Sequence, residues 1–372
     1  MTRYWPLHRE PEPGVVSEAA DLVRHSPPAV RKIEGLDFIR AFAAVNVTLF
    51  HLTGVYGTSF GFKDTVYFQV HASIGIPLFF VLTGYLIPPA FARSTPPAII
   101  EKRYVRLLPA LFVCSLLTVA TLLLFPFPER YPTPSIFTWI VNLTMLPKMV
   151  GVEFLDGQYW SLQAQMCFLL FLCLCALMRL RDYLVIVVNI LLVYAMVLYG
   201  FGLHLVVYDL PQISKILINN FLTLFQLPYL RFFAVGIFIY CLHRKRLTPS
   251  VYLMILLTIF HEVVIPRNGV LLFAVTGAIV AAHIFWTPFY AKWRIVRFFA
   301  NISYSLFLLH LAIGWIAIRE LESIGINSNA VLAIALTGLV GLSALVHYYF
   351  EMPLYRFLRR HRYFKDKSPS PV

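Results

Sequence analysis

Charged residues are scarce in this sequence. Asp, Glu, Lys and Arg make up 13% of the 372 residues, whereas 59% are hydrophobic. Soluble domains carry about 25% charged residues, so the composition argues against a soluble globular protein and indicates a polytopic membrane protein. Acidic residues are the scarcer kind: 18 Asp and Glu stand against 31 Lys and Arg, which gives a formal net charge of +13.

Other common features are lacking as well. The five cysteines all fall inside apolar stretches, which argues against a disulfide framework and against a zinc site, and no metal is expected. The first 33 residues are polar and contain prolines but no apolar core, so they are interpreted as a cytoplasmic tail and not as a signal peptide. The sequence shows no second soluble domain, internal repeat or low-complexity segment.

The excess of positive charge does not indicate nucleic-acid binding. The basic residues lie in short clusters between apolar runs, which is typical of cytoplasmic loops beside anionic lipid. The apolar runs predict an all-α bundle of about ten transmembrane helices. The expected spans are 36–56, 74–91, 107–125, 160–177, 184–207, 227–242, 249–265, 270–289, 302–318 and 330–350.

The basic clusters predict an orientation for this bundle. Each cluster precedes the first expected span or follows an even-numbered one, so all of them share one side of a ten-span protein. Because cytoplasmic loops are enriched in Lys and Arg, both termini are expected in the cytoplasm. Three segments result: an N-terminal tail (1–33), a transmembrane domain (34–355) and a basic C-terminal tail (356–372).

The first span carries three ionisable residues, Asp37, Arg40 and His51. Arg40 and His51 are eleven residues apart, close to three helical turns, so they share a face about 16 Å apart along the axis. Charged groups inside a span are costly and usually face a cavity or a partner, which indicates a polar tunnel. The alternative is an arginine that reaches the interface and a histidine packed in the bundle.

This pattern of an Arg, ten residues and a His, in a span that begins LDFIRAFAA, resembles the membrane acyltransferase-3 family. Members are integral-membrane enzymes that O-acylate carbohydrates and other hydroxyl acceptors. The resemblance extends over residues 33–360 and rests on six segments in the family's order. One of them, PLFFVLTGYLI, is similar to the family's Ser-Gly-Tyr-Leu-Ile with Thr83 for Ser, although a Gly beside a hydroxyl residue is also typical of close helix packing.

The segment EKRYVRLLPAL contains Arg103 and Arg106, which share a helix face at the expected cytoplasmic mouth. Two guanidinium groups held by a helix suit bidentate phosphate binding, and the similar family element is thought to meet the nucleotide of acyl-CoA. A simple positive-inside anchor is the other interpretation.

The fourth span opens with QYWSLQAQ, similar to the family's Tyr-Trp-Ser/Thr-Leu-x-x-Glu. Trp160 and Ser161 match, but Gln165 stands where the family has Glu. A Gln cannot ionise and so cannot act as an acid or base, although it can hydrogen-bond a neighbour. This departure leaves open whether the protein is a catalyst.

Two segments near the C-terminus complete the resemblance. NISYSLFLLH, with Tyr304 and His310, is similar to the family's Ile-Ser-Tyr-Ser-x-Tyr-Leu-x-His, and His310 is either a helper to His51 or a buried hydrogen-bonding residue. Glu351, in a Glu-x-Pro element, is the expected counter-charge of Arg40, Arg103 or Arg106.

Two further ionisable sites lie outside the resemblance. Arg231, in the sixth span, is either a functional residue or an arginine at the outer interface. His261 and Glu262 are expected to pair with Arg267 in a structural role.

The resemblance implies an acyltransferase that moves an acyl group, with acetyl expected, from cytoplasmic acyl-CoA to a hydroxyl of a lipid-linked or cell-surface carbohydrate. The expected location is a bacterial inner membrane. His51 would be the general base, Arg40 would hold the donor or stabilise the oxyanion, and Arg103 and Arg106 would bind the CoA. The supporting residues would be Asp37, Trp160, Ser161, Gln165, Tyr304, His310 and Glu351. A transporter or flippase, or a non-catalytic relative, stays open as an alternative.

Overall fold

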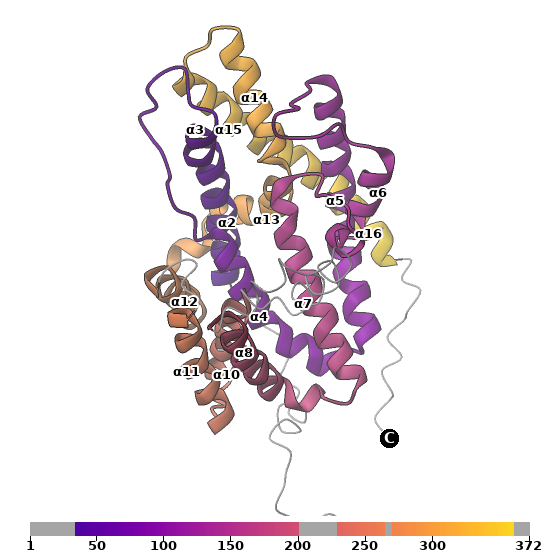
Figure 1. The fold of residues 1–372 in the computed structure, drawn as a ribbon, viewed down its shortest axis with the longest axis vertical. Helices are drawn as coiled ribbons and strands as arrows, with labels where there is room; N and C mark the ends of the chain where they lie inside the picture. Colours follow the sequence, from indigo (N-terminus) through magenta and orange to yellow (C-terminus); the bar gives the residue numbers. More distant parts are fainter. Residues whose placement is uncertain (1–33, 201–228, 265–269, 287, 361–372) are drawn as a thin grey trace, which may run out of the picture.

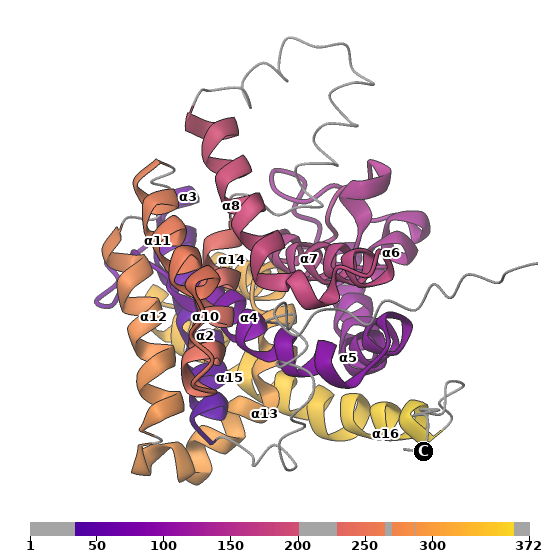
Figure 2. The same ribbon diagram turned by 90° about the horizontal axis from the view of Figure 1, so that it is seen from below.

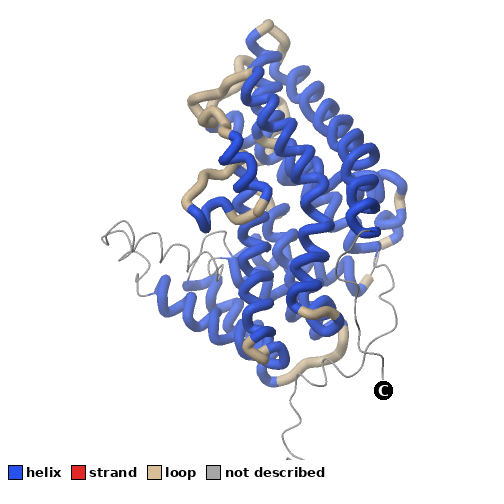
Figure 3. Tube along the Cα trace, turned by 90° about the vertical axis from the view of Figure 1, so that its right-hand side faces the viewer, coloured by secondary structure: helices blue, strands red, loops and turns tan. Residues whose placement is uncertain are grey.

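The computed structural model describes residues 34–200, 229–264, 270–286 and 288–360. These residues form helices and loops, without a β-strand (Figure 3), and the predicted all-α class is confirmed. The tails at 1–33 and 361–372, the end of the fifth expected span beyond residue 200 and Arg267 lie outside the described residues.

Among the described residues, five helices are long and apolar enough to cross a membrane, and they coincide with the first four expected spans and the tenth. The first three are α2 (Glu34–Leu49), which continues through the π-helical η1 (Phe50–Val55) into α3 (Tyr56–Ser59), α4 (Gly75–Arg93) and α5 (Pro96–Leu124). The other two are α7 (Trp160–Leu177), preceded by η3 (Gly157–Tyr159), and α15 (Ser328–Leu345), which continues through the π-helical η8 (Val346–Glu351) into α16 (Met352–Arg360).

The ninth expected span is a broken helix and not a straight one. Its two parts, α13 (Arg294–Leu309) and α14 (Ala312–Ser323), meet at an angle of 72°, and counting the pair as one crossing gives six candidate spans. Four shorter apolar helices occupy the fifth to eighth expected spans: α8 (Leu184–Gly200), α10 (Leu230–His243), α11 (Pro249–Val264) and α12 (Val270–Phe285). The total of ten spans and the cytoplasmic orientation of the termini stay predictions.

The connecting segments contain the remaining short helices. α6 (Ile136–Leu143) lies in the long loop after α5 and begins at Ser135, whose Oγ accepts a hydrogen bond from the Thr138 N–H at 3.0 Å. Three 3-10 turns complete the described chain: η2 (Pro147–Val150), η4 (Arg181–Tyr183) and η7 (Phe289–Lys292).

Helix α2 packs against α4, α12 and α13 (Figure 1). Viewed from below, α11 and α12 stand on one side of the bundle, while α5, α6 and α16 stand on the other (Figure 2). α4 also packs closely on α10, because a Cβ atom at Gly84 would lie only 2.1 Å from the Phe233 carbonyl oxygen. Gly84 therefore allows this close approach, as the packing interpretation of the Thr-Gly pair predicted.

The loop between α3 and α4 folds back along the first helix. Asn46 in α2 accepts hydrogen bonds from the backbone N–H groups of Ile74 and Gly75 at 3.0 and 3.2 Å, so its side chain caps α4. Further along, Thr53 in η1 accepts from the Val70 N–H at 2.9 Å. A Cβ atom at Gly54 would lie 2.1 Å from the Val70 carbonyl oxygen, so only glycine fits where the loop crosses η1.

Candidate active site

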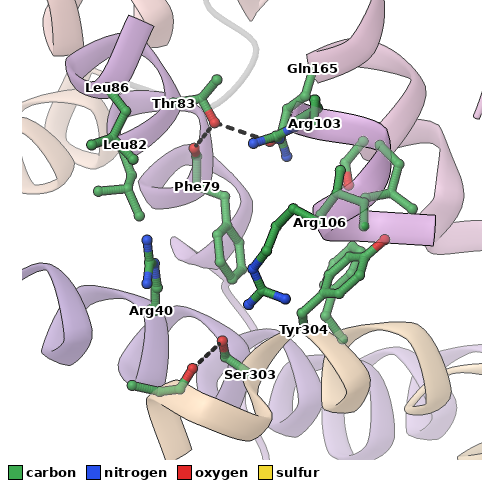
Figure 4. Close-up of a pocket in the computed structure, with 15 residues that line it drawn as sticks. Arg40, Phe79, Leu82, Thr83, Leu86, Arg103, Arg106, Gln165, Ser303 and Tyr304 are labelled. Atoms are coloured by element: carbon green, nitrogen blue, oxygen red, sulfur yellow. Dashed lines mark hydrogen bonds between the residues drawn. The ribbon is translucent and has the colours of Figure 1, made fainter. Parts of the chain in front are cut away.

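A cavity of about 160 Å³ lies between α2, α4, α5, α7 and α13. Three arginines line it, Arg40 from α2 and Arg103 and Arg106 from α5, and their guanidinium groups enter the same space (Figure 4). The structure therefore brings together six predicted site residues from four helices: Arg40, Arg103, Arg106, Ser161, Gln165 and Tyr304.

Two of the three arginines have carboxylate partners. Arg106 Nη1 lies 2.5 Å from Glu351 Oε1. Of the three arginines expected as possible partners of Glu351, Arg106 is therefore the one that pairs with it. Glu351 is fully buried in η8, and its other oxygen accepts from Ser305 Oγ and from His347 Nδ1, both at 2.9 Å. Arg40 Nη1 lies 3.7 Å from Asp37 Oδ1, one turn earlier on the same helix.

Arg103 differs, because its partner is neutral. Its Nη2 donates to Gln165 Oε1 at 2.5 Å, and Thr83 Oγ1 donates to the same oxygen at 3.0 Å. In the part of the chain that the structure describes, Arg103 makes no ion pair. The Gln at the family's Glu position therefore contacts Arg103 and not a histidine.

The other predicted residues around the cavity have distinct places. Tyr304 lines it, and its buried hydroxyl has no hydrogen-bond partner among the described residues. Ser161 also lines it and donates to the Gln158 carbonyl oxygen at 3.2 Å. Trp160 packs instead on the rings of Phe80 and Tyr229, with centroids 6.0 and 4.9 Å away, so it supports the start of α7 and does not line the cavity.

The two predicted histidines contact each other. His310, fully buried at the break between α13 and α14, places Nε2 3.2 Å from Nδ1 of His51 in η1. Short π-helical segments are frequent at functional sites. His310 Nδ1 also lies 2.8 Å from the Phe307 carbonyl oxygen, and His51 Nδ1 lies 3.0 Å from the Val47 carbonyl oxygen.

These contacts determine the tautomers of the neutral rings. A carbonyl oxygen only accepts, so the hydrogen of His310 resides on Nδ1 and its Nε2 is an acceptor. The hydrogen of His51 then resides on its own Nδ1, shared between Val47 and His310. His51 Nε2 consequently carries a lone pair, and this atom has no partner among the described residues.

Aromatic rings separate the cavity from the histidine pair. Phe307 lines the cavity and also packs against His310, with ring centroids 5.7 Å apart. Phe79, another lining residue, lies 5.9 Å from Phe307. His51 itself does not line the cavity, so the polar tunnel from Arg40 to His51 stays a prediction.

Two residues that the sequence analysis did not single out hold the helix break open. In a continuous α-helix the Ala312 N–H would donate to the Leu308 carbonyl. Instead, Asp156 Oδ2 accepts from the Ala312 N–H at 3.1 Å, and Gln158 Nε2 donates to the Leu308 carbonyl at 2.9 Å. These side chains replace the missing backbone bond, which explains why the ninth expected span bends beside His310.

Asp156 is fully buried and accepts four hydrogen bonds. Besides Ala312, the donors are Tyr131 Oη, the Gly157 N–H and Gln158 Nε2, at 3.0, 2.8 and 2.8 Å. Burial raises the pKa of Asp156 to about 6, and the hydrogen bonds oppose this shift. The only sequence signal was a polar triplet, DGQ, just before the fourth span.

Arg231 and Glu262 form a separate buried ion pair, with Nε and Oε2 2.5 Å apart. The interpretation of Arg231 as an arginine at the outer interface is wrong, because its side chain is fully buried. Glu262 pairs with Arg231; its expected partner, Arg267, lies outside the described residues, so that pairing stays a prediction. This ion pair connects α10 to α11.

Long apolar helices surround an arginine-lined cavity and a neighbouring pair of histidines, as in a multi-pass membrane protein with a polar interior site. The sequence matches the acyltransferase-3 family model, described as an acyltransferase domain, over residues 33–349. The chain therefore belongs to the acyltransferase-3 family, as its motifs predicted, and this supports a membrane acyltransferase in general. Comparisons with curated proteins and with solved structures gave no match.

Proposed function

We propose that this protein is a membrane O-acyltransferase. It transfers an acyl group, with acetyl expected, from cytoplasmic acyl-CoA to a hydroxyl of a lipid-linked or cell-surface carbohydrate in a bacterial inner membrane. The observation that carries the proposal is His51 Nε2, which has no partner among the described residues, in a tautomer imposed by His310, beyond an arginine-lined cavity.

The arginine-lined cavity supports the donor side of the reaction. Phosphate groups of CoA would lie among Arg40, Arg103 and Arg106, because guanidinium groups recognise phosphate through paired, charge-assisted hydrogen bonds. The flexible pantetheine arm would then extend past Phe79 and Phe307 toward the histidines. Both rings line the arginine-lined cavity, and Phe307 contacts His310.

The histidine pair supports the chemical step. The hydroxyl of the acceptor transfers its proton to His51 Nε2 while its oxygen attacks the thioester carbonyl carbon. The resulting oxyanion collapses, the C–S bond breaks, and the CoA thiolate takes the proton back from His51. His310 Nε2 accepts a hydrogen bond from His51 Nδ1 throughout, which orients the ring and stabilises its protonated form, as the third member of a catalytic triad does.

Gln165 affects donor binding and does not affect the general base. Its side chain contacts Arg103 and Thr83, so the loss of a carboxylate there leaves His51 and His310 unaffected. This contact favours a catalyst over a non-catalytic relative.

The proposal is tested by mass spectrometry of surface glycans from cells that contain the protein and from cells that lack its gene. Glycans of the first should carry acyl groups that are absent from the second. Identical acylation in both strains, with the protein present in the membrane, would reject an acyltransferase acting on surface carbohydrate.

A further inference from the structure

We infer that Gln165 leaves the arginine-lined cavity with one guanidinium that no carboxylate of the described residues neutralises, so that the anionic group of the donor serves as the counter-ion of Arg103. This inference rests on the proposed acyl-CoA site and concerns how strongly that site depends on the charge of its ligand. It makes Gln165 a determinant of donor binding in this chain.

The three arginines around the cavity differ in the charge of their partners. Three arginines line it. Arg40 lies near Asp37 and Arg106 pairs with Glu351, whereas Arg103 is bonded to the uncharged amide of Gln165. Among the described residues, three cations therefore have two carboxylate partners.

Among the described residues, hydrogen bonds in the cavity wall fix Arg103 in position and leave a donor beside it unsatisfied. Gln165 Oε1 accepts from both Arg103 and Thr83, which holds the Arg103 side chain in place without neutralising it. The buried Tyr304 hydroxyl, in the same wall, has no partner among the described residues. A buried polar group without a partner calls for an explanation, and a phosphate oxygen that accepts from Tyr304 beside Arg103 provides one.

The charge of Arg103 favours binding of an anion. A partly buried cation without a counter-charge is costly, and a bound phosphate group removes that cost. A Glu at position 165 would pair with Arg103 and would have to be displaced, or repelled, by an incoming anion. The Gln therefore strengthens anion binding and makes it steeply dependent on ionic strength.

The test measures CoA binding by calorimetry to the purified protein in lipid nanodiscs, at low and high salt. We expect Gln165→Glu to weaken CoA binding about tenfold at low salt, which corresponds to about 1.4 kcal/mol, and to flatten the salt dependence. Gln163→Glu is the matched control, because Gln163 is a buried residue of the same helix outside the cavity, and its Oε1 accepts from the Lys148 N–H at 3.0 Å. This control should bind CoA as the wild type does.

A second measurement does not depend on a stable Gln165→Glu protein. Inorganic phosphate should raise the unfolding temperature of the wild type, and this rise should be lost in Arg103→Gln. Equal CoA affinity of Gln165→Glu and wild type, or a phosphate effect that persists in Arg103→Gln, would overturn the inference and leave the acyltransferase proposal standing. A wild type that binds no CoA at all would overturn the donor site itself.

Discussion

His310 Nε2 lies 3.2 Å from His51 Nδ1, and this contact connects the first span to the broken one. The tautomer of each histidine therefore depends on the other. Because His310 bonds the Phe307 carbonyl through Nδ1, it can only accept from His51, which leaves His51 Nε2 free to take a proton. The contact thus relates a structural feature, the bend of the helix, to the proposed chemistry.

The first prediction concerns His310. His310→Ala should lower acyl transfer by about 10–10²-fold through loss of ring orientation, a smaller loss than removal of the base itself causes. CoA binding should stay at the wild-type level, since the residue is outside the cavity. Glycan acylation normalised to folded protein is the measurement, and full activity of the variant would reduce His310 to a packing residue.

The second prediction concerns Asp156 and pH. Asp156→Asn places an amide N–H₂ where two backbone N–H groups, Tyr131 and Gln158 all donate, so it should destabilise the fold by about 1–3 kcal/mol at low pH. The pKa of Asp156 is raised to about 6 in the folded protein, above its value in the unfolded chain. A group with a raised pKa stabilises fully below the unfolded value and loses that contribution as the pH rises through the folded value.

The wild type should therefore lose stability, relative to Asp156→Asn, as the pH rises from about 4 to about 6. Thermal unfolding of both proteins across this range is the measurement. Parallel pH profiles would show that Asp156 does not titrate as its burial indicates.

The third prediction separates Arg103 from Arg106. Arg106→Gln removes the arginine partner of the buried Glu351 and should cost up to about 3 kcal/mol of stability without ligand, less than for a fully buried pair because Arg106 is 42% exposed. Arg103→Gln removes a cation whose partner among the described residues is neutral, and it should cost less. Both should weaken CoA binding. A larger loss of stability in Arg103→Gln would contradict the pairing described here.

Part of this architecture could be predicted from the sequence. Apolar runs predicted the helices because each long run is apolar enough to be recognised without tertiary information. The charges on the first and third spans placed Arg40, Arg103 and Arg106 at one level, and the structure brings them to one cavity. Glu351 had three possible partners, because spacing along a helix specifies its level but not which neighbour it faces.

Other features depend on contacts that a sequence does not reveal. The bend beside His310 depends on Asp156 and Gln158, about 150 residues away in the chain, and nothing in the local sequence of α13 predicts it. The pairing of Arg231 with Glu262 likewise depends on how α10 packs against α11. In each case polar groups of two segments far apart in the sequence bond each other, and only the three-dimensional structure reveals the pairing.

The fourth prediction tests the orientation. Cysteines introduced as Thr133→Cys and Lys245→Cys, in a background without the five native cysteines, should be labelled by a membrane-impermeant reagent from opposite sides. Thr133 is expected outside and Lys245 inside, as the positive-inside rule predicts. Labelling of both positions from one side would contradict the ten-span arrangement.

The central claim is that His51 is the base and not part of the donor site. His51→Ala removes the only ring nitrogen of the pair that is left free to accept a proton, so it should lower acyl transfer by about 10²–10⁴-fold. Its CoA affinity should equal that of the wild type, because His51 does not line the arginine-lined cavity. Glycan acylation, divided by the amount of folded protein that binds CoA, measures both at once: the account predicts near-complete loss of acylation with CoA binding intact, and substantial acylation by His51→Ala would contradict it.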